Sequence, residues 1–276
     1  MIKQEVLEEI RQLEFLDLSV ILGRPGVPST GGFYCEKENA LEEMKRLGVK
    51  NALTYHITSK GYKPVYGNKR LIAEIGETKE LLISWILIPD EEEMGCTPSQ
   101  FIIKLKENNV KAVRLFPASQ SNASVSTRYS FTKWFYGDFM EALEKDKVPV
   151  ILSFNPHRRA EPEWDKIFSL ASEYPDLPII LTDVFTRATL SLVKLMKLKP
   201  NIYVQTTGLC LQRQLEFMVD KLGPERFIAG SNYPDMHLGA MIAQVYLANL
   251  TYKQKKLIAG DNARCLMGII KNGGSE

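Results

Sequence analysis

The chain has few features of membrane, nucleic-acid-binding or disulfide-stabilised proteins. No apolar run approaches the roughly 18 residues of a membrane span. A net charge of +2, a pI near 8.2 and the absence of a long basic run argue against nucleic acid as a partner. The first residues show an amphipathic helix pattern without the apolar segment of a signal peptide. The four cysteines form no C-x-x-C pair, so we expect reduced thiols in a cytoplasmic protein.

Eight short apolar runs alternate with helical patterns along the chain. The runs are nearly continuous and rich in Val, Ile and Leu, which is typical of strands buried on both faces of a parallel sheet. They are Phe15–Leu22, Asn51–Ile57, Leu81–Ile88, Val110–Phe116, Val148–Phe154, Leu177–Val184, Ile202–Thr207 and Arg226–Gly230. The helical patterns are Glu38–Leu47, Asn68–Glu77, Pro98–Asn109, Phe131–Lys145, Glu161–Glu173, Leu190–Lys197, Leu211–Leu222 and Leu238–Asn249.

Eight such units predict an α/β fold, a (β/α)₈ TIM barrel, with residues 1–276 forming one domain. The alternative is an open doubly wound sheet. That fold would need a glycine-rich dinucleotide turn after the first strand, and Gly23–Gly26 does not supply one.

Three segments resemble the amidohydrolase-related (amidohydrolase type 2) family of metal-dependent hydrolases, whose members are TIM barrels. The segments are P-N-I-Y-V-Q-T-T-G (200–208), R-F-I-A-G-S-N-Y-P (226–234) and K-K-L-I-A-G-D-N-A-R-C-L-M-G-I (255–269). The resemblance implies a hydrolase-type barrel with a C-terminal closing helix over about residues 251–270.

The family's metal-binding positions carry different residues in this chain. Strict alternation along the first strand would place Asp17, Ser19 and Ile21 on one face. The positions that the family fills with four histidines and one aspartate then map to Ser19, Ile21, Ser153, Asp183 and Asn232. A zinc site needs about three strong protein ligands, and an amide is no base at neutral pH. We therefore expect no metal cofactor, although weak Mg²⁺ or Ca²⁺ binding is compatible with these groups.

Candidate proton-transfer groups lie at the predicted strand ends. The chain has three histidines, His56, His157 and His237, and each ends or follows a strand. Such a histidine often has no function, yet it can also act as an acid, a base or a hydrogen-bond donor. The candidate catalytic residues are Asp183, Asp17, His56 and His237.

Arg114 is the main candidate for ligand binding. It alternates with Ala112 and Phe116, so it should point into the barrel, where an arginine needs an anionic partner. The partner is either an internal aspartate, Asp17 or Asp183, or a carboxylate or phosphate ligand. The candidate substrate-binding residues are Arg114, Arg24, Arg187, Asn155 and Asn232.

Two functions are consistent with these residues. The first is a hydrolase or lyase that acts on a small, anionic substrate without a tightly bound metal. The second is a catalytically inactive relative that binds a small molecule or a protein partner. The sequence leaves the substrate and the oligomeric state open, and a homo-oligomer is compatible with it.

Overall fold

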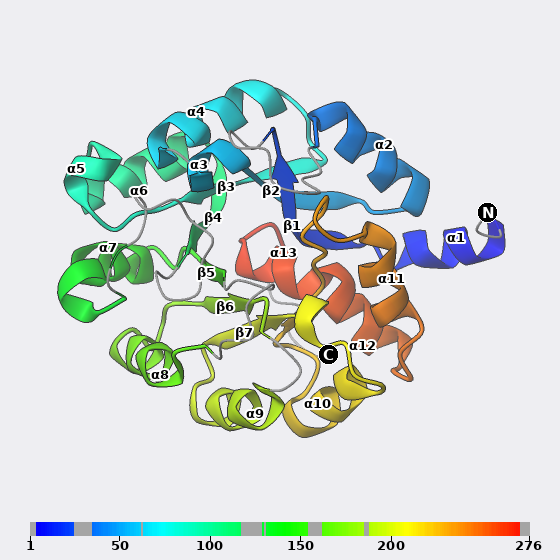
Figure 1. Ribbon diagram of the computed structural model, residues 1–276. Helices are drawn as coiled ribbons and strands as arrows, with labels where there is room; N and C mark the ends of the chain where they lie inside the picture. The colour runs from blue at the N-terminus through cyan, green and yellow to red at the C-terminus, as the bar shows by residue number, and fades with distance from the viewer. Residues whose placement is uncertain are drawn as a thin grey trace.

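The computed structural model describes residues 4–24, 35–61, 63–116, 129, 131–153, 162–184 and 188–270. Eight parallel strands, paired in the order β1 to β8, form a barrel with helices around it (Figure 1). Backbone hydrogen bonds from Leu18 N to Ala229 O (3.0 Å) and from Ile21 N to Tyr233 O (2.8 Å) bring the last strand back to the first. The predicted (β/α)₈ barrel is therefore confirmed.

The strands begin and end close to the predicted positions. They are β1 Leu16–Leu22, β2 Asn51–His56, β3 Leu81–Ile86, β4 Val110–Leu115, β5 Val150–Ser153, β6 Ile179–Thr182, β7 Ile202–Gln205 and β8 Phe227–Ile228. The helices are α1 Gln4–Gln12, α2 Lys37–Leu47, α3 Ile57–Gly61, α4 Pro64–Ile75, α5 Glu91–Met94, α6 Pro98–Glu107, α7 Lys133–Lys145, α8 Trp164–Glu173, α9 Thr189–Leu198, α10 Gln214–Leu222, α11 Leu238–Tyr246, α12 Tyr252–Lys256 and α13 Asn262–Leu266. A 3₁₀ turn, Thr206–Gly208, follows β7.

Two short helices, α3 and α5, were not predicted, and the predicted closing helix is divided. A π-helical turn, Leu257–Asp261, lies between α12 and α13. The wider turn lets Asn262 N bond to Leu257 O, so the carbonyl of Ile258 is free to accept from Ala229 N at 2.9 Å. The interruption therefore ties the C-terminal segment to the strand that closes the barrel.

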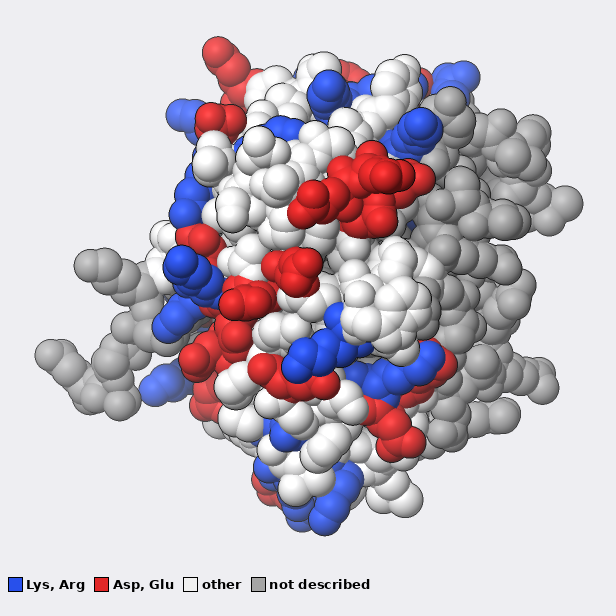
Figure 2. All heavy atoms as spheres, turned by 90° about the vertical axis from the view of Figure 1, so that its left-hand side faces the viewer, with Lys and Arg blue, Asp and Glu red and all other residues white. Residues whose placement is uncertain are grey.

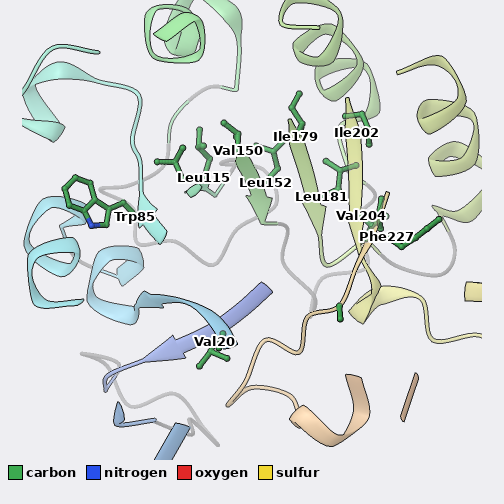
Figure 3. Packing of buried hydrophobic residues seen from close by; sticks show 14 of the residues in the cluster. Val20, Trp85, Leu115, Val150, Leu152, Ile179, Leu181, Ile202, Val204 and Phe227 are labelled. Atoms are coloured by element: carbon green, nitrogen blue, oxygen red, sulfur yellow. The ribbon is translucent and has the colours of Figure 1, made fainter. Parts of the chain in front are cut away.

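The hydrophobic core has two layers. The outer layer fills the space between barrel and helices and includes Val20, Trp85, Leu115, Leu152 and Phe227 (Figure 3). The inner layer fills the lower barrel, where each strand contributes at least one side chain and α13 packs across the end. Its buried members are Leu16, Leu18, Leu53, Ala112, Ile151, Ile180, Ile228, Ala263 and Met267, and the partly buried Leu82 and Tyr203 are the contributions of β3 and β7. The closed lower end leaves the upper end, where the strands finish, for a site.

The prediction that Asp17, Ser19 and Ile21 share one face of β1 is wrong. The pairing of β1 with β2 shifts between Asp17 and Val20, as a β-bulge does. Leu18 packs inside the lower barrel, and Ile21 packs inside the upper barrel with Tyr55. Leu18 and Ile21 are three positions apart in the sequence, whereas strict alternation would separate two inward-facing residues by two or four. A bulge changes the side-chain alternation, which a period of two cannot anticipate.

Within the described ranges, no helix is both long enough and apolar enough to cross a membrane. Acidic and basic side chains are interspersed on the face shown in Figure 2, on the side of α5, α6 and α7. The described residues of this face thus offer no continuous surface of one charge.

We expect Asn68→Ala to lower the free energy of unfolding by about 2–4 kcal/mol. Asn68 on α4 is buried, and its amide donates to Ile86 O (2.9 Å) and accepts from Ile86 N (3.0 Å). Its loss leaves both backbone groups unpaired. Urea unfolding would measure the change. Asn51→Ala, which removes one 3.4 Å bond at an exposed position, is the control and should cost less than about 1 kcal/mol.

Candidate active site

The centre of the upper barrel is occupied by the guanidinium of Arg114, on β4. The side chain is buried, with 1% of its surface exposed. Its Nη1 donates to Ser153 Oγ on β5 (2.5 Å), and its Nη2 donates to Leu18 O on β1 (3.2 Å). Its Cζ lies 4.7 Å from the ring centroid of Tyr55 on β2. Arg114 therefore contacts three other strands, as its predicted inward orientation requires.

This buried cation lacks a close anionic partner among the described residues. No carboxylate in those ranges lies within 4.0 Å of its nitrogens, and Arg114 Nε is buried there without a hydrogen-bond acceptor. Burial lowers the pKa of Arg114, and the charges of Asp183 and Asp17 oppose this effect from a longer distance. Within the described part of the chain, this guanidinium therefore has one unused donor and only distant counter-charges.

A chain of hydrogen-bonded polar groups runs from Arg114 across the ends of β5 to β8. Its members, which we call the strand-end chain, are Ser153, Thr182, Asp183, Asn232, Gln205 and Thr207. Thr182 Oγ1 lies 3.1 Å from both Ser153 Oγ and Asp183 Oδ2. Asn232 Nδ2 donates to Asp183 Oδ1, and Gln205 Nε2 donates to Asn232 Oδ1 (3.2 Å) and Thr207 Oγ1 (2.5 Å). The structure therefore brings Arg114, Asp183 and Asn232 into one polar cluster.

Two members of the strand-end chain have unusual backbone conformations. Asp183 has φ 59° and Asn232 has φ 63°, in the left-handed region that few residues other than glycine adopt. Such conformations persist only where the surrounding structure holds them. Here the hydrogen bond between the side chains of Asn232 and Asp183 helps to stabilise both conformations.

Asp183 is the carboxylate of the strand-end chain. Burial raises its pKa, while the positive charge of Arg114 and the hydrogen bonds from Thr182 and Asn232 lower it. A carboxyl whose pKa is raised holds a proton more readily than an ordinary aspartate does.

Asp17 belongs to a separate arrangement beside the strand-end chain. Its Oδ1 accepts from Ser231 N (2.8 Å) and Ser19 N (2.9 Å), and its Oδ2 accepts from the hydroxyl of Ser231. Burial raises its pKa to about 6 against the effect of these bonds. The carboxylate thus links β1 to the segment after β8, which is a structural role.

The remaining candidate residues lie elsewhere. His56 is buried against Gly23, where an added Cβ would lie 2.4 Å from His56 Nε2, and Glu74 Oε2 is 3.4 Å from that nitrogen. Burial lowers the pKa of His56 to about 4, so the ring is neutral at neutral pH. His237 is exposed beside a cavity of about 350 Å³ between α10 and α11. Arg24 is exposed and pairs with Glu36 at 3.1 Å.

Two predicted substrate-binding residues, Asn155 and Arg187, lie outside the described residues, as does His157. The structure therefore places three of the candidates together, Arg114, Asp183 and Asn232, with Asp17 beside them.

Lys60 is a group that the sequence did not indicate. It lies on α3, immediately after β2, and its Nζ is 4.8 Å from the ring centroid of Phe116. Burial lowers its pKa, which the charges of Asp183 and Asp235 raise and that of Arg114 lowers. No ion pair of Lys60 within 4.0 Å occurs among the described residues. The residue was missed because Ile57–Gly61 has no sequence pattern typical of a helix.

The upper barrel therefore has two unlike halves. Tyr55 and Phe116, whose ring centroids are 6.0 Å apart, pack with Ile21 and Ile86 on the side of β1 to β4. The strand-end chain lies on the side of β5 to β8. In the described residues, no three His, Cys, Asp or Glu side chains converge as a metal site would require.

The family comparison agrees with this architecture. The model of the amidohydrolase family matches residues 67–269, and the chain belongs to that family. No curated protein has a significant sequence match to the chain.

Solved structures with the same barrel include two decarboxylases and a dihydroorotase. Dihydroxybenzoic acid decarboxylase from Polaromonas sp. JS666, with bound manganese and the inhibitor 2-nitroresorcinol, is 14% identical with a TM-score of 0.71. The match covers 93% of this chain and 97% of that one. 2,6-Dihydroxybenzoate decarboxylase from Rhizobium is 14% identical with a TM-score of 0.69, and the match covers 92% of this chain and 98% of that one. Dihydroorotase from Campylobacter jejuni is 15% identical with a TM-score of 0.59, and the match covers 95% of this chain and 85% of that one. At these identities the similarity shows the fold alone.

We expect Asp17→Asn to flatten the dependence of stability on pH between about pH 4 and 6. With a pKa near 6 in the folded state and an ordinary value of 3.8, the folded protein holds a proton that the unfolded chain releases. The free energy of unfolding of the native protein should therefore fall as pH rises through this window, by up to about 3 kcal/mol from Asp17. Asp183 contributes a fall in the same direction to both proteins, so the difference between them isolates Asp17.

Denaturant unfolding at several pH values would make this comparison. Parallel profiles for the native protein and Asp17→Asn would show that Asp17 keeps an ordinary pKa in the folded protein.

Proposed function

We propose that this chain is an amidohydrolase-family barrel that binds and converts a small organic carboxylate without a tightly bound divalent metal. The observation that carries the proposal is the buried guanidinium of Arg114, with an unused Nε donor and no carboxylate within 4.0 Å among the described residues. A ligand carboxylate would supply the missing counter-charge, and in a site of low polarity such a charge-assisted bond is strong.

The two halves of the upper barrel favour a particular kind of acid. The rings of Tyr55 and Phe116 suit an apolar or planar body, while the strand-end chain offers partners to polar substituents. The decarboxylases with the same fold are named for aromatic acids of this character. These names support an aromatic acid as the ligand to test.

The residues do not fit the divalent metal of the family. Ile21 has no lone pair, Ser153 Oγ already accepts from Arg114, and Asn232 directs its amide hydrogen at Asp183. Asp183 is the one carboxylate of the strand-end chain, and a guanidinium in the same network would repel a second cation. We therefore derive no step through a metal.

In this proposal Asp183 is the group that accepts and returns a proton. Its raised pKa, its hydrogen bonds from Thr182 and Asn232 and its position near Arg114 support that role. His56 is turned toward Gly23 and Glu74, and His237 borders another cavity, so neither is assigned to proton transfer. Asn232 holds Asp183 in place, which is a positioning role.

The second candidate, a catalytically inactive binding protein, is favoured by one observation. Each side chain of the strand-end chain already makes a hydrogen bond within the protein, although the buried Oε1 of Gln205 has no partner among the described residues. The two candidates share the carboxylate site and differ in whether a bound acid is converted, which product analysis by NMR would decide.

We expect carboxylates to raise the melting temperature and matched neutral ligands to leave it unchanged. Benzoate and benzamide form a suitable pair, because they differ mainly in charge. A ligand that binds only the folded state at 100 times its Kd stabilises it by about 2.7 kcal/mol. Arg114→Met should abolish the response, whereas Asp183→Asn should increase it, because removing a nearby negative charge strengthens anion binding.

The opposite direction of the two variants makes the result independent of any general loss of stability. Arg46→Met, which changes an exposed arginine paired with Glu43, is the control and should respond as the native protein does. Equal responses to benzoate and benzamide, or no response to any acid, would contradict the anion site.

We also expect the purified protein to contain far less than one equivalent of zinc or manganese. The reason is the donor set described above, with a single carboxylate and a fixed cation. Elemental analysis and the melting temperature with and without a chelator would measure this. One equivalent of metal per chain, with destabilisation on its removal, would overturn the metal-free proposal.

A further inference from the structure

The surface formed by α9, α10 and α11, which we call the α9–α11 face, carries a cluster of exposed apolar side chains. Of the thirteen large apolar side chains that are exposed among the described residues, five line two adjoining hollows on this face. They are Leu190, Leu211, Phe217, Met236 and Leu247. Leu190 is 81% exposed and Leu247 is 75% exposed. Single exposed apolar side chains are ordinary on a protein surface, whereas a cluster around a hollow is typical of an interaction surface.

The two hollows form one continuous surface. The first, of about 350 Å³, lies between α10 and α11, and the second, of about 980 Å³, is lined by α10 and the starts of α9 and α12. Leu211, Arg213 and Glu216 line both of them. The helices α9 and α10 lie side by side, with α11 further around the barrel (Figure 1). The α9–α11 face therefore has projecting apolar side chains and recesses next to each other.

Two opposite charges on this face lack an ion pair. Asp220, which lines the second hollow, pairs with Lys221 at 3.0 Å. Arg213 and Glu216 have no oppositely charged partner within 4.0 Å among the described residues. One oxygen of Glu216 accepts from Asn249 N (3.1 Å), which leaves its other oxygen available. A face with one unpaired charge of each sign is complementary to a copy of itself, whereas a strongly acidic or strongly basic partner would be repelled by one of the two charges.

We propose that the α9–α11 face binds the same face of a second copy of this chain and forms a two-fold symmetric dimer. In such an interface every contact occurs twice, so Arg213 of each copy can pair with Glu216 of the other. The same symmetry lets one surface supply both the projecting leucines and the hollows that receive them. The inference is independent of the proposed carboxylate site, because it uses a different part of the surface.

This interface would border the strand-end chain. Thr207, a member of that chain, lines the first hollow together with Gly230, whose carbonyl accepts from the Thr207 hydroxyl. A second copy packed over the hollow would exclude water from this end of the strand-end chain. Dimer formation would therefore complete the burial of a hydrogen-bond network that also contains Asp183.

Sedimentation velocity of the native protein at roughly 1 to 100 µM tests the proposal. We expect the monomer to convert to a dimer as the concentration rises. Leu190→Glu and Leu211→Glu should each raise the dissociation constant at least about tenfold, because each places a charge in the apolar contact. Ile103→Glu is the control. It changes a side chain of α6 that is 55% exposed and lines neither hollow, so the dissociation constant should not change. Circular dichroism would verify that all three variants are folded.

Exchange of the two charges tests whether the partner is a second copy. Arg213→Glu should weaken the dimer, because it places acidic side chains of the two copies opposite each other. The double variant Arg213→Glu with Glu216→Arg should recover most of the association, since the reversed charges are again complementary. A change in the fold of one chain would not produce such a recovery.

Two results would overturn the proposal. A native protein that stays monomeric at every concentration would show that the face does not bind its own copy, and would assign it to a different partner. A dimer that is unchanged in both Leu190→Glu and Leu211→Glu would place the contact elsewhere on the surface. Neither result bears on the carboxylate site, which the response of the same variants to benzoate tests separately.

Discussion

The buried guanidinium of Arg114 is the interaction on which the upper barrel depends. A charge transferred from water into a protein interior costs several kcal/mol unless hydrogen bonds and counter-charges offset the loss of hydration. The hydrogen bonds of Arg114 to Ser153 and to the carbonyl of Leu18, and its contact with the face of Tyr55, offset part of the lost hydration free energy. These contacts lie on three other strands, so one side chain fixes the relative positions of β1, β2, β4 and β5.

The strand-end chain follows from the same constraint. Asp183 is kept near Arg114 because each charge moderates the desolvation of the other. Asn232 and Thr182 then complete the hydrogen bonding of the carboxylate, and Gln205 completes that of Asn232. Gly230, in the segment after β8, leaves room for the side chain of Gln205, since an added Cβ would lie 2.6 Å from Gln205 Nε2. A polar half and an aromatic half of the barrel thus meet at the arginine.

The sequence predicted the barrel and the inward orientation of Arg114 because strand periodicity reports burial directly. It could not predict the bulge in β1, which depends on pairing with β2, and so it misplaced Asp17 relative to Ile21. Asn and Asp adopt left-handed conformations more readily than other non-glycine residues, but the sequence does not distinguish Asp183 and Asn232 from the chain's other Asp and Asn residues. The sequence also did not indicate Lys60, because the helix that carries it, α3, depends on its tertiary contact with Gly67 and is not indicated by local helix propensity.

A fixed cation and a bound metal differ in the chemistry they support. A metal withdraws electrons from its ligands and lowers the pKa of a bound water, whereas a guanidinium orients an anion and stabilises charge through hydrogen bonds. Under the proposed function, catalysis must therefore come from prearranged hydrogen-bond donors and from proton transfer at Asp183.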